Sequence, residues 1–111
     1  MKITAIKTYR VRIPLKPERR MISALGKHDV SHYLVLRIET DTGIQGAGEA
    51  TVLCRWSGET AWGAQAIVDR VFTPLLIGQD PCDIANINQI LDRTSQGNWF
   101  AKSAIEMACW D

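Results

Sequence analysis

The feature that most constrains the fold is a turn sequence between two stretches in which apolar and polar residues alternate. Asp41-Thr42-Gly43 joins His32–Thr40 to Ile44–Ala50, and the glycine of this turn can adopt a positive φ angle without steric penalty. Alternation at every second position is typical of strands with one buried face. The pattern predicts a β-hairpin whose first strand buries Leu34, Leu36 and Ile38. Gly46 and Gly48 weaken the second strand, and close approach of another backbone or simple tight packing would explain them equally well.

A third alternating stretch, Ile3–Ile13, opens the chain and predicts another half-buried strand. The apolar residues of one parity are Ile3, Ala5, Tyr9, Val11 and Ile13, and the alternation is interrupted at Ile6 and Lys7. Together with the hairpin, this stretch predicts a three-stranded antiparallel meander. Pro14 ends the strand, and we expect a long, partly apolar loop up to Asp29, of a length that compact domains usually reserve for lids and binding loops.

After the strands, the apolar spacing changes to the three-and-four spacing of helices. One helix is predicted from Glu59 to about Thr73, with Ser57 as its N-cap and Pro74 at its end. Its buried residues would be Ala64, Ile67, Val68, Val71 and Phe72. A second helix should begin at Asp80-Pro81-Cys82-Asp83, which combines a cap, an early proline and an acid in the first turn. It should end near Gln96-Gly97, and its buried stripe would be Ile84, Ile87 and Leu91.

The last helix is predicted to run from near Phe100 to the final residue. Its apolar stripe contains Ala101, Ala104, Ile105, Ala108 and Cys109. Helices usually end with Gly or Asn beyond the last turn and with basic residues near the final carbonyls, whereas this one ends in Trp110 and Asp111. We therefore interpret the chain as the front part of a larger protein. We expect the stripe and Trp110 to be exposed until a following domain covers them.

Composition argues against several classes of function. A net charge of +1 gives no general attraction for nucleic acid or for an anionic membrane surface. The uncharged stretches are too short to span a bilayer and no signal peptide is visible, so we expect a cytoplasmic protein. Cys54, Cys82 and Cys109 are odd in number and widely spaced, which favours free and mostly packed thiols over disulfides or a zinc site.

The residue patterns contain no complete catalytic or metal-binding motif. His28-Asp29 and the nearby His32 could provide acid–base chemistry, although a solvated loop end is the favoured interpretation. Glu49, at the end of a strand, is better explained by a structural role than by ligand binding. Arg55 next to Trp56 could hold an anionic, partly apolar ligand, and an exposed arginine packed on a tryptophan explains the pair equally well.

Four segments in order are characteristic of one family. They are the opening I-x-x-I-x-x-Y-x-V-x-I-P-L from Ile3, then Thr42–Ala50, Pro74–Pro81 and Asn98–Asp111. Together they resemble the N-terminal domain of the enolase superfamily, in the branch of muconate lactonizing enzyme and mandelate racemase. The resemblance covers essentially the whole chain, and its last segment is most similar to the muconate cycloisomerases.

The resemblance implies an α+β fold, with a three-stranded antiparallel meander followed by a helical segment. Residues 1–97 would form a capping domain, and residues 98–111 would begin a TIM-like barrel that this chain lacks. The implied enzyme is a Mg²⁺-dependent isomerase or cycloisomerase that removes the proton next to a carboxylate. Its metal ligands and acid–base groups would lie in the barrel, so no catalytic or metal-binding residue is assigned to this chain. The implied partners are a small carboxylate substrate, the barrel domain and further copies of the enzyme.

In this family two loops of the capping domain cover the barrel mouth, exclude water and contact the variable part of the substrate. By resemblance these loops are Leu15–Asp29 and Thr51–Gly58. The candidates for substrate contact are Met21, Ile22, Leu25, Leu53, Arg55 and Trp56. Cys54-Arg55-Trp56 stands where small residues and glycines are more usual in cycloisomerases, which argues against muconate itself as the substrate.

Two other hypotheses remain at this point. The chain could be a free-standing module that binds a ligand or a protein through Arg55 and Trp56, and a reading frame that stopped at Asp111 would favour this. It could also be a small acid–base enzyme that uses His28 and Asp29, which a His28→Gln variant would test.

Overall fold

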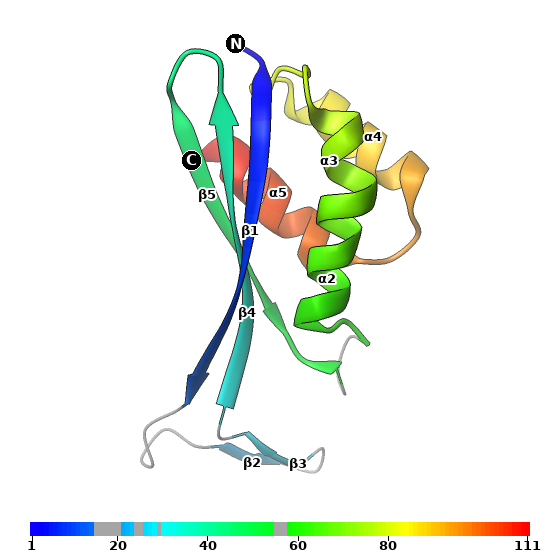
Figure 1. Ribbon diagram of the computed structural model, residues 1–111. Coiled ribbons are helices and arrows are strands. Elements are labelled where there is room, and N and C mark those ends of the chain that lie inside the picture. Colours follow the sequence, from blue (N-terminus) through cyan, green and yellow to red (C-terminus); the bar gives the residue numbers. More distant parts are fainter. Residues whose placement is uncertain (15–20, 24–25, 29, 55–57) are drawn as a thin grey trace.

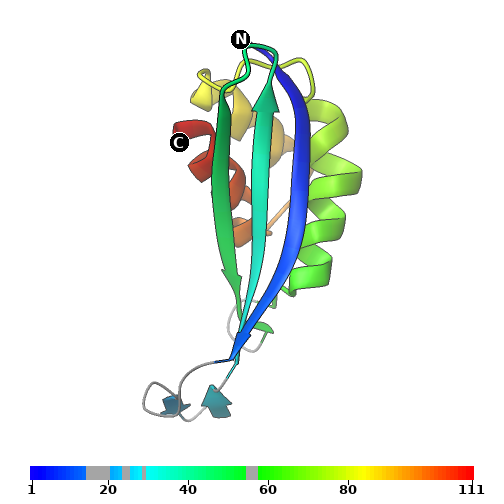
Figure 2. The same ribbon diagram turned by 60° about the vertical axis from the view of Figure 1, so that its left-hand side comes forward.

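The computed structural model describes residues 1–14, 21–23, 26–28, 30–54 and 58–111. A long, twisted three-stranded sheet forms one layer, and the helices pack against one face of it (Figures 1 and 2). The α+β fold predicted from the sequence is confirmed. No helix among these residues is long and apolar enough to cross a membrane.

The main sheet is the predicted meander. Strands β1 (Ile3–Pro14), β4 (Val30–Thr40) and β5 (Gln45–Val52) lie in the order β1-β4-β5, and both pairs are antiparallel. Gly43 has a φ angle of 84° in the turn between β4 and β5, as expected for a glycine at this position. Leu34, Leu36 and Ile38 are buried, as predicted.

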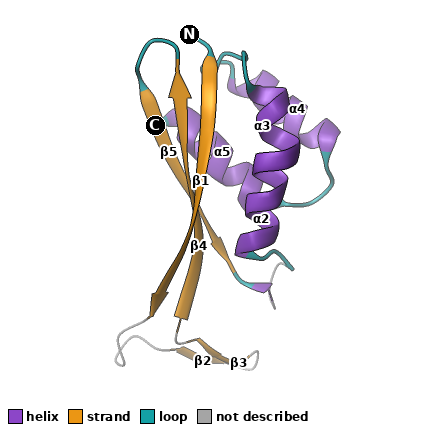
Figure 3. Ribbon diagram, in the orientation of Figure 1, coloured by secondary structure: helices purple, strands orange, loops and turns teal. Residues whose placement is uncertain are grey.

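The segment predicted to be an uninterrupted loop contains two short strands. β2 (Met21–Ser23) and β3 (Gly26–His28) pair antiparallel in a small separate sheet, seen at the lower end of the molecule in Figure 3. A three-residue strand is too short for alternation to be recognised, which explains why the sequence did not reveal it.

The buried face of β1 differs from the prediction. Ile3 and Ile6 are buried, whereas Tyr9 and Ile13, assigned to the same face as Ile3, are each 48% exposed. The cause is a β-bulge: Ile3 pairs with Thr40 but Ala5 pairs with Glu39, so β1 contains one extra residue. A one-residue shift moves every later side chain to the other face of the sheet.

The first helical segment begins and ends later than predicted. α2 (Ala61–Ile67) continues through a π-helical turn, η2 (Val68–Phe72), into α3 (Thr73–Leu76). Its buried residues are Ala61, Ala64, Val68, Phe72 and Leu76. Val71, predicted to be buried, is 37% exposed. Pro74 does not end the segment. It lies at the start of α3, directly after the π-helical turn, where the backbone hydrogen-bonding pattern changes.

Hydroxyl and carboxylate side chains cap the first two helical segments. The N-cap of α2 is Thr60, whose Oγ1 accepts a hydrogen bond from Gly63 N at 3.0 Å. The predicted cap, Ser57, lies outside the described residues. The N-terminus of α4 (Ile84–Thr94) is capped by Asp83, which accepts from Asn86 N at 3.2 Å. A helix does follow Asp80–Asp83, but the roles of these residues differ from the prediction. The cap is Asp83 rather than Asp80, and Pro81 lies before the helix, in a turn where Asp80 Oδ1 accepts from Cys82 N.

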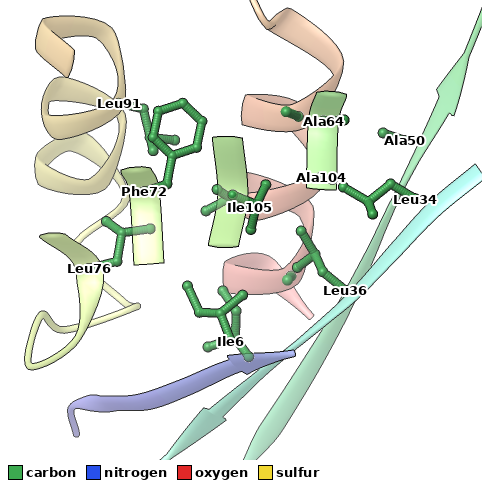
Figure 4. Packing of buried hydrophobic residues seen from close by; sticks show 14 of the residues in the cluster. Ile6, Leu34, Leu36, Ala50, Ala64, Phe72, Leu76, Leu91, Ala104 and Ile105 are labelled. Carbon is green, nitrogen blue, oxygen red and sulfur yellow. The ribbon is translucent and has the colours of Figure 1, made fainter. Parts of the chain in front are cut away.

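Helix α5 (Trp99–Trp110) carries the predicted apolar stripe, but the stripe is not exposed. Ala101, Ala104, Ile105 and Ala108 are buried against the rest of the domain, and only Trp110 is exposed as expected, at 73%. α5 packs directly against β5. Figure 4 shows Ala104 and Ile105 facing Leu34 and Leu36 of the sheet.

Two glycines make this packing possible. A Cβ atom on Gly48 would overlap the carbonyl oxygen of Ala104, and one on Gly46 would overlap that of Ala108. The helix backbone therefore occupies the space that two strand side chains would fill. Of the two explanations left open for these glycines, the close approach of another backbone is the one observed.

The last residue also binds the sheet. Asp111 Oδ2 accepts a hydrogen bond from the backbone N–H of Ala47 in β5 at 3.0 Å. An acid at a helix C-terminus is unfavourable for the helix dipole, and this hydrogen bond offsets that cost. The hydrogen bond to Ala47 explains why an acid stands at the end of α5, which the sequence alone did not explain.

Candidate functional site

The two predicted substrate loops leave the sheet at the same end. In the strand register, Pro14 at the end of β1 pairs with Val30 of β4, and Val52 at the end of β5 pairs with His32, two residues further along β4. The connection from β1 to β4 and the segment after β5 therefore start close together (Figure 1). The β4–β5 turn lies at the opposite end.

The first of these loops contains the β2–β3 hairpin. Met21 and Ile22 belong to β2, where Met21 pairs with His28 and Ile22 pairs with Lys27. Leu25 lies outside the described residues. The structure thus gives backbone positions for two of the three candidates in this loop.

The second loop is closed by its own backbone. Gly58 N donates to the carbonyl oxygen of Cys54 at 2.9 Å, and Gly58 has a φ angle of 77°. Leu53 is half-buried and Cys54 is exposed. Arg55 and Trp56 lie outside the described residues. The hydrogen bond fixes the distance between Cys54 and Gly58, the residues on either side of the segment that contains these two candidates.

The residue after this loop links it to α5. Glu59 Oε1 accepts from Phe100 N at 3.1 Å, and its Oε2 accepts from Ala101 N at 3.3 Å. These N–H groups belong to the first turn of α5. Backbone N–H groups in the first turn of a helix have no acceptor within the helix. The sequence analysis missed this role, because the partners are more than forty residues apart and no local motif joins them.

The acid–base candidates do not form a cluster in the described structure. His32 is exposed in β4, and His28 lies in β3 next to Asp29, which is outside the described residues. Glu49 is exposed on β5, opposite Val35 of β4. Among the described residues there is no group of three or more His, Cys, Asp and Glu side chains that could hold a metal ion.

A buried lysine was also missed. Lys102 is only 6% exposed, and its Nζ donates to the carbonyl oxygen of Ser95 at 2.7 Å and to Asp92 Oδ1 at 3.3 Å. Its ammonium also lies 4.6 Å from the centroid of the Trp99 ring. Lys102 is three residues before Ile105 and hence on the same side of α5, which is the one signal in the sequence that could have indicated its burial. It connects α4 with α5 and has no contact with the two loops in the described part of the chain.

One pocket in the described structure lies at the other end of the sheet from the loops. Its volume is about 290 Å³. Its lining is mainly apolar and includes Met1, Ile44, Ile84, Cys109 and Trp110. It coincides with none of the substrate-contact candidates.

The three cysteines are free, but only one is packed. Cys54 and Cys82 are exposed, which corrects the prediction of mostly packed thiols, and Cys109 is partly buried. Burial raises the pKa of the Cys109 thiol from 9.0 to about 11, and the nearby Cys82 and Glu106 act in the same direction.

Cys109 should therefore be a slow nucleophile in the folded protein. At pH 8 we expect alkylation of Cys109 to be about 100-fold slower in the folded than in the urea-unfolded chain, because only the thiolate reacts. Since the folded state holds this proton more tightly, its contribution to stability is present below pH 9 and lost as the pH rises toward 11. Peptide mass spectrometry after iodoacetamide treatment measures the rate. Equal rates in both states would contradict the prediction.

Comparisons with known proteins agree with this architecture. Residues 3–111 match the family model "Mandelate racemase / muconate lactonizing enzyme, N-terminal domain". The chain is 36% identical to N-succinyl-L-Arg/Lys racemase of Bacillus cereus over 111 residues, covering 100% of this chain and 30% of the racemase. It is 34% identical over 103 residues to a chloromuconate cycloisomerase of Cupriavidus pinatubonensis, covering 91% of this chain and 27% of that enzyme.

Solved structures of such enzymes share the fold. The crystal structure of the Bacillus cereus racemase matches with a TM-score of 0.93 and 35% identity, covering 99% of this chain and 29% of that one. A dipeptide epimerase from Enterococcus faecalis, in complex with Mg and the dipeptide L-Leu-L-Tyr, matches with a TM-score of 0.92 and 31% identity, covering 99% and 30%.

The chain belongs to the family of N-terminal domains of mandelate racemase and muconate lactonizing enzyme. It spans about 30% of the length of the curated relatives that it matches. The family resemblance inferred from the sequence is confirmed.

Proposed function

We propose that this chain is the capping and specificity domain of a Mg²⁺-dependent isomerase or cycloisomerase that removes the proton next to a carboxylate. The observation that carries the proposal is the match of the whole chain to the N-terminal domains of a racemase and an epimerase, at TM-scores of 0.93 and 0.92. The chain covers under a third of each of those proteins, which supports a further domain in the full-length protein.

We propose that residues 1–97 form the capping domain and that residues 98–111 lead from it into the barrel. In this arrangement α5 is the last element held by the cap, since it packs on β5 through Gly46 and Gly48. The following chain would then leave from a helix whose position is fixed.

We propose that the two loops contact the substrate. This is supported by their origin at one end of the sheet, away from the β4–β5 turn. The side chains in this role would be Met21, Ile22, Leu25, Leu53, Arg55 and Trp56. An arginine among mainly apolar residues would suit a substrate with an anionic group and an apolar part.

The described residues do not fit a magnesium site, because they contain no group of three or more His, Cys, Asp and Glu side chains that could hold a metal ion. We propose that the ion is held by the barrel domain. The Mg in the Enterococcus faecalis epimerase supports a metal in the full-length protein.

We also propose an oligomeric, cytoplasmic enzyme. Half-exposed Tyr9 and Ile13 on the uncovered face of the sheet support self-association, and three free cysteines are usual in a reducing compartment.

The test begins with the coding sequence beyond Asp111, which should continue for the length of a barrel. The full-length protein should then exchange the α-proton of at least one acid for deuterium, in a panel of N-succinyl amino acids, dipeptides and muconates followed by NMR in D₂O. Exchange should stop with EDTA and return with Mg²⁺. Absence of metal-dependent exchange across the panel would contradict the proposal.

The specificity role has its own test. Arg55→Ala should raise KM for the best acid about tenfold, as loss of a charged contact predicts. Arg70→Ala, a change at an exposed position on the helical segment α2–α3, is the matched control and should leave KM unchanged. Equal KM values for both variants would remove Arg55 from the binding site.

A further inference from the structure

The carboxylate of Glu59 caps a helix that is distant in sequence. Each of its oxygens accepts one backbone N–H of α5, from Phe100 at 3.1 Å and from Ala101 at 3.3 Å. Negative charge at a helix N-terminus is favoured by the helix dipole, and hydrogen bonds to a charged acceptor are among the stronger ones in proteins. Glu59 is therefore a strong link between two separate parts of the chain.

Helix α5 depends on this link, because the side chain of its local N-cap residue makes no capping hydrogen bond. Asn98 has a left-handed conformation, with a φ angle of 56°. Its side-chain amide donates to Ser95 Oγ at 3.2 Å and to the carbonyl oxygen of Gln96 at 3.1 Å, both in the loop before the helix. Glu59 thus performs for α5 the function that a local serine or aspartate usually performs.

The residues on either side of Glu59 are also held. Gly58 N closes the second loop on Cys54 O, and Thr60 caps α2. Ala61 and Ala64, in the first turns of α2, are buried in the core. The segment Gly58–Thr60 therefore connects the end of the loop to α2 on one side and to α5 on the other.

We propose that Glu59 is a positioning residue that fixes the end of the second loop, at Gly58–Thr60, relative to α5 and so sets the substrate preference of the enzyme. The second part of this statement rests on the proposed function, because it requires the loop to contact substrate. Glu59 acts through the loop, with its carboxylate engaged by α5. Loss of its hydrogen bonds should release the end of the loop while leaving the core intact.

The first experiment is hydrogen exchange on the longest form of the protein that the coding region supplies. Glu59→Gln replaces one acceptor oxygen with a donor, and Asp83→Asn makes the equivalent change at the cap of α4, which makes it the matched control. We expect the amides of Gly58–Thr60 to exchange about tenfold faster in Glu59→Gln, as loss of a charge-assisted hydrogen bond predicts, and to be unchanged in Asp83→Asn. Unchanged exchange in Glu59→Gln would overturn the proposal.

The second experiment separates positioning from simple helix capping. In the active full-length enzyme, Glu59→Gln should change the ratio of kcat/KM between two acids about fivefold or more, mainly through KM, whereas Asp83→Asn should preserve it. Faster exchange with an unchanged ratio would reduce Glu59 to a cap of α5 and overturn the specificity part. If no acid is turned over at all, the proposed function fails, and the exchange result alone decides whether Glu59 fixes the loop.

A milder variant keeps the test valid if Glu59→Gln does not fold. Glu59→Asp retains the charge but shortens the side chain by one methylene. It should increase exchange in the same segment by less than Glu59→Gln. Exchange at the wild-type rate in Glu59→Asp, in a case where Glu59→Gln cannot be prepared, would count against the proposal.

Discussion

Replacing Gly48 with valine should lower the free energy of unfolding by about 3 kcal/mol or more, which is at or above the upper end of the usual range for overpacking. Even the first added carbon, Cβ, would overlap the carbonyl oxygen of Ala104. The obstacle is helix backbone, which cannot change rotamer as a side chain can. α5 would have to move away from β5, and Ala104 and Ile105 would lose their core contacts.

Ala47→Val provides the matched control for this experiment. Ala47 is adjacent in β5 but exposed, so valine there meets no helix, and its β-branched side chain suits a strand. We expect a change within about 0.5 kcal/mol for this variant. Urea denaturation followed by tryptophan fluorescence measures both. Equal midpoints for Gly48→Val and Ala47→Val would show that α5 is not seated on β5.

Phe72→Ala is the second variant with a large expected effect, a loss of about 3–5 kcal/mol of unfolding free energy. Phe72 is completely buried in the π turn, and Figure 4 shows its ring beside Leu91 of α4. Removing the ring would leave a cavity among α3, α4 and α5, whose backbones are held by their own helical hydrogen bonds and can close it only in part.

Val71→Ala is the control for Phe72→Ala, since Val71 is the preceding residue and is partly exposed. We expect it to cost less than about 1 kcal/mol, because most of the lost surface already faces solvent. Thermal unfolding by circular dichroism would report both variants. A Phe72→Ala protein as stable as Val71→Ala would mean that the π turn is not part of the core.

The elements themselves were predictable because they have local signals. The turn at Gly43 and the alternation that buries Leu34 and Leu36 are each encoded within a few residues. The register of β1 was not predictable in this way. A bulge near Thr4 reverses the parity of the strand, and its presence depends on pairing with β4.

The long-range contacts were beyond local reasoning for the same physical reason. The sequence shows that α5 has an apolar stripe, but not whether a missing domain or the chain's own sheet covers it. Glu59 and Lys102 look like ordinary surface residues until folding brings α5 beside them or α4 beside α5. All six substrate-contact candidates remain predictions from the family resemblance: Met21, Ile22, Leu25, Leu53, Arg55 and Trp56.

The hydrogen bond between Ala47 and Asp111 has a consequence for association between molecules. β5 is an edge strand, and the outward N–H groups of an edge strand can pair with a strand of another chain. Asp111 occupies one of these donors and α5 lies across the strand. The end of α5 thus hinders the pairing of another chain with this edge of the sheet, and a protein cut before Asp111 would have one more free donor there.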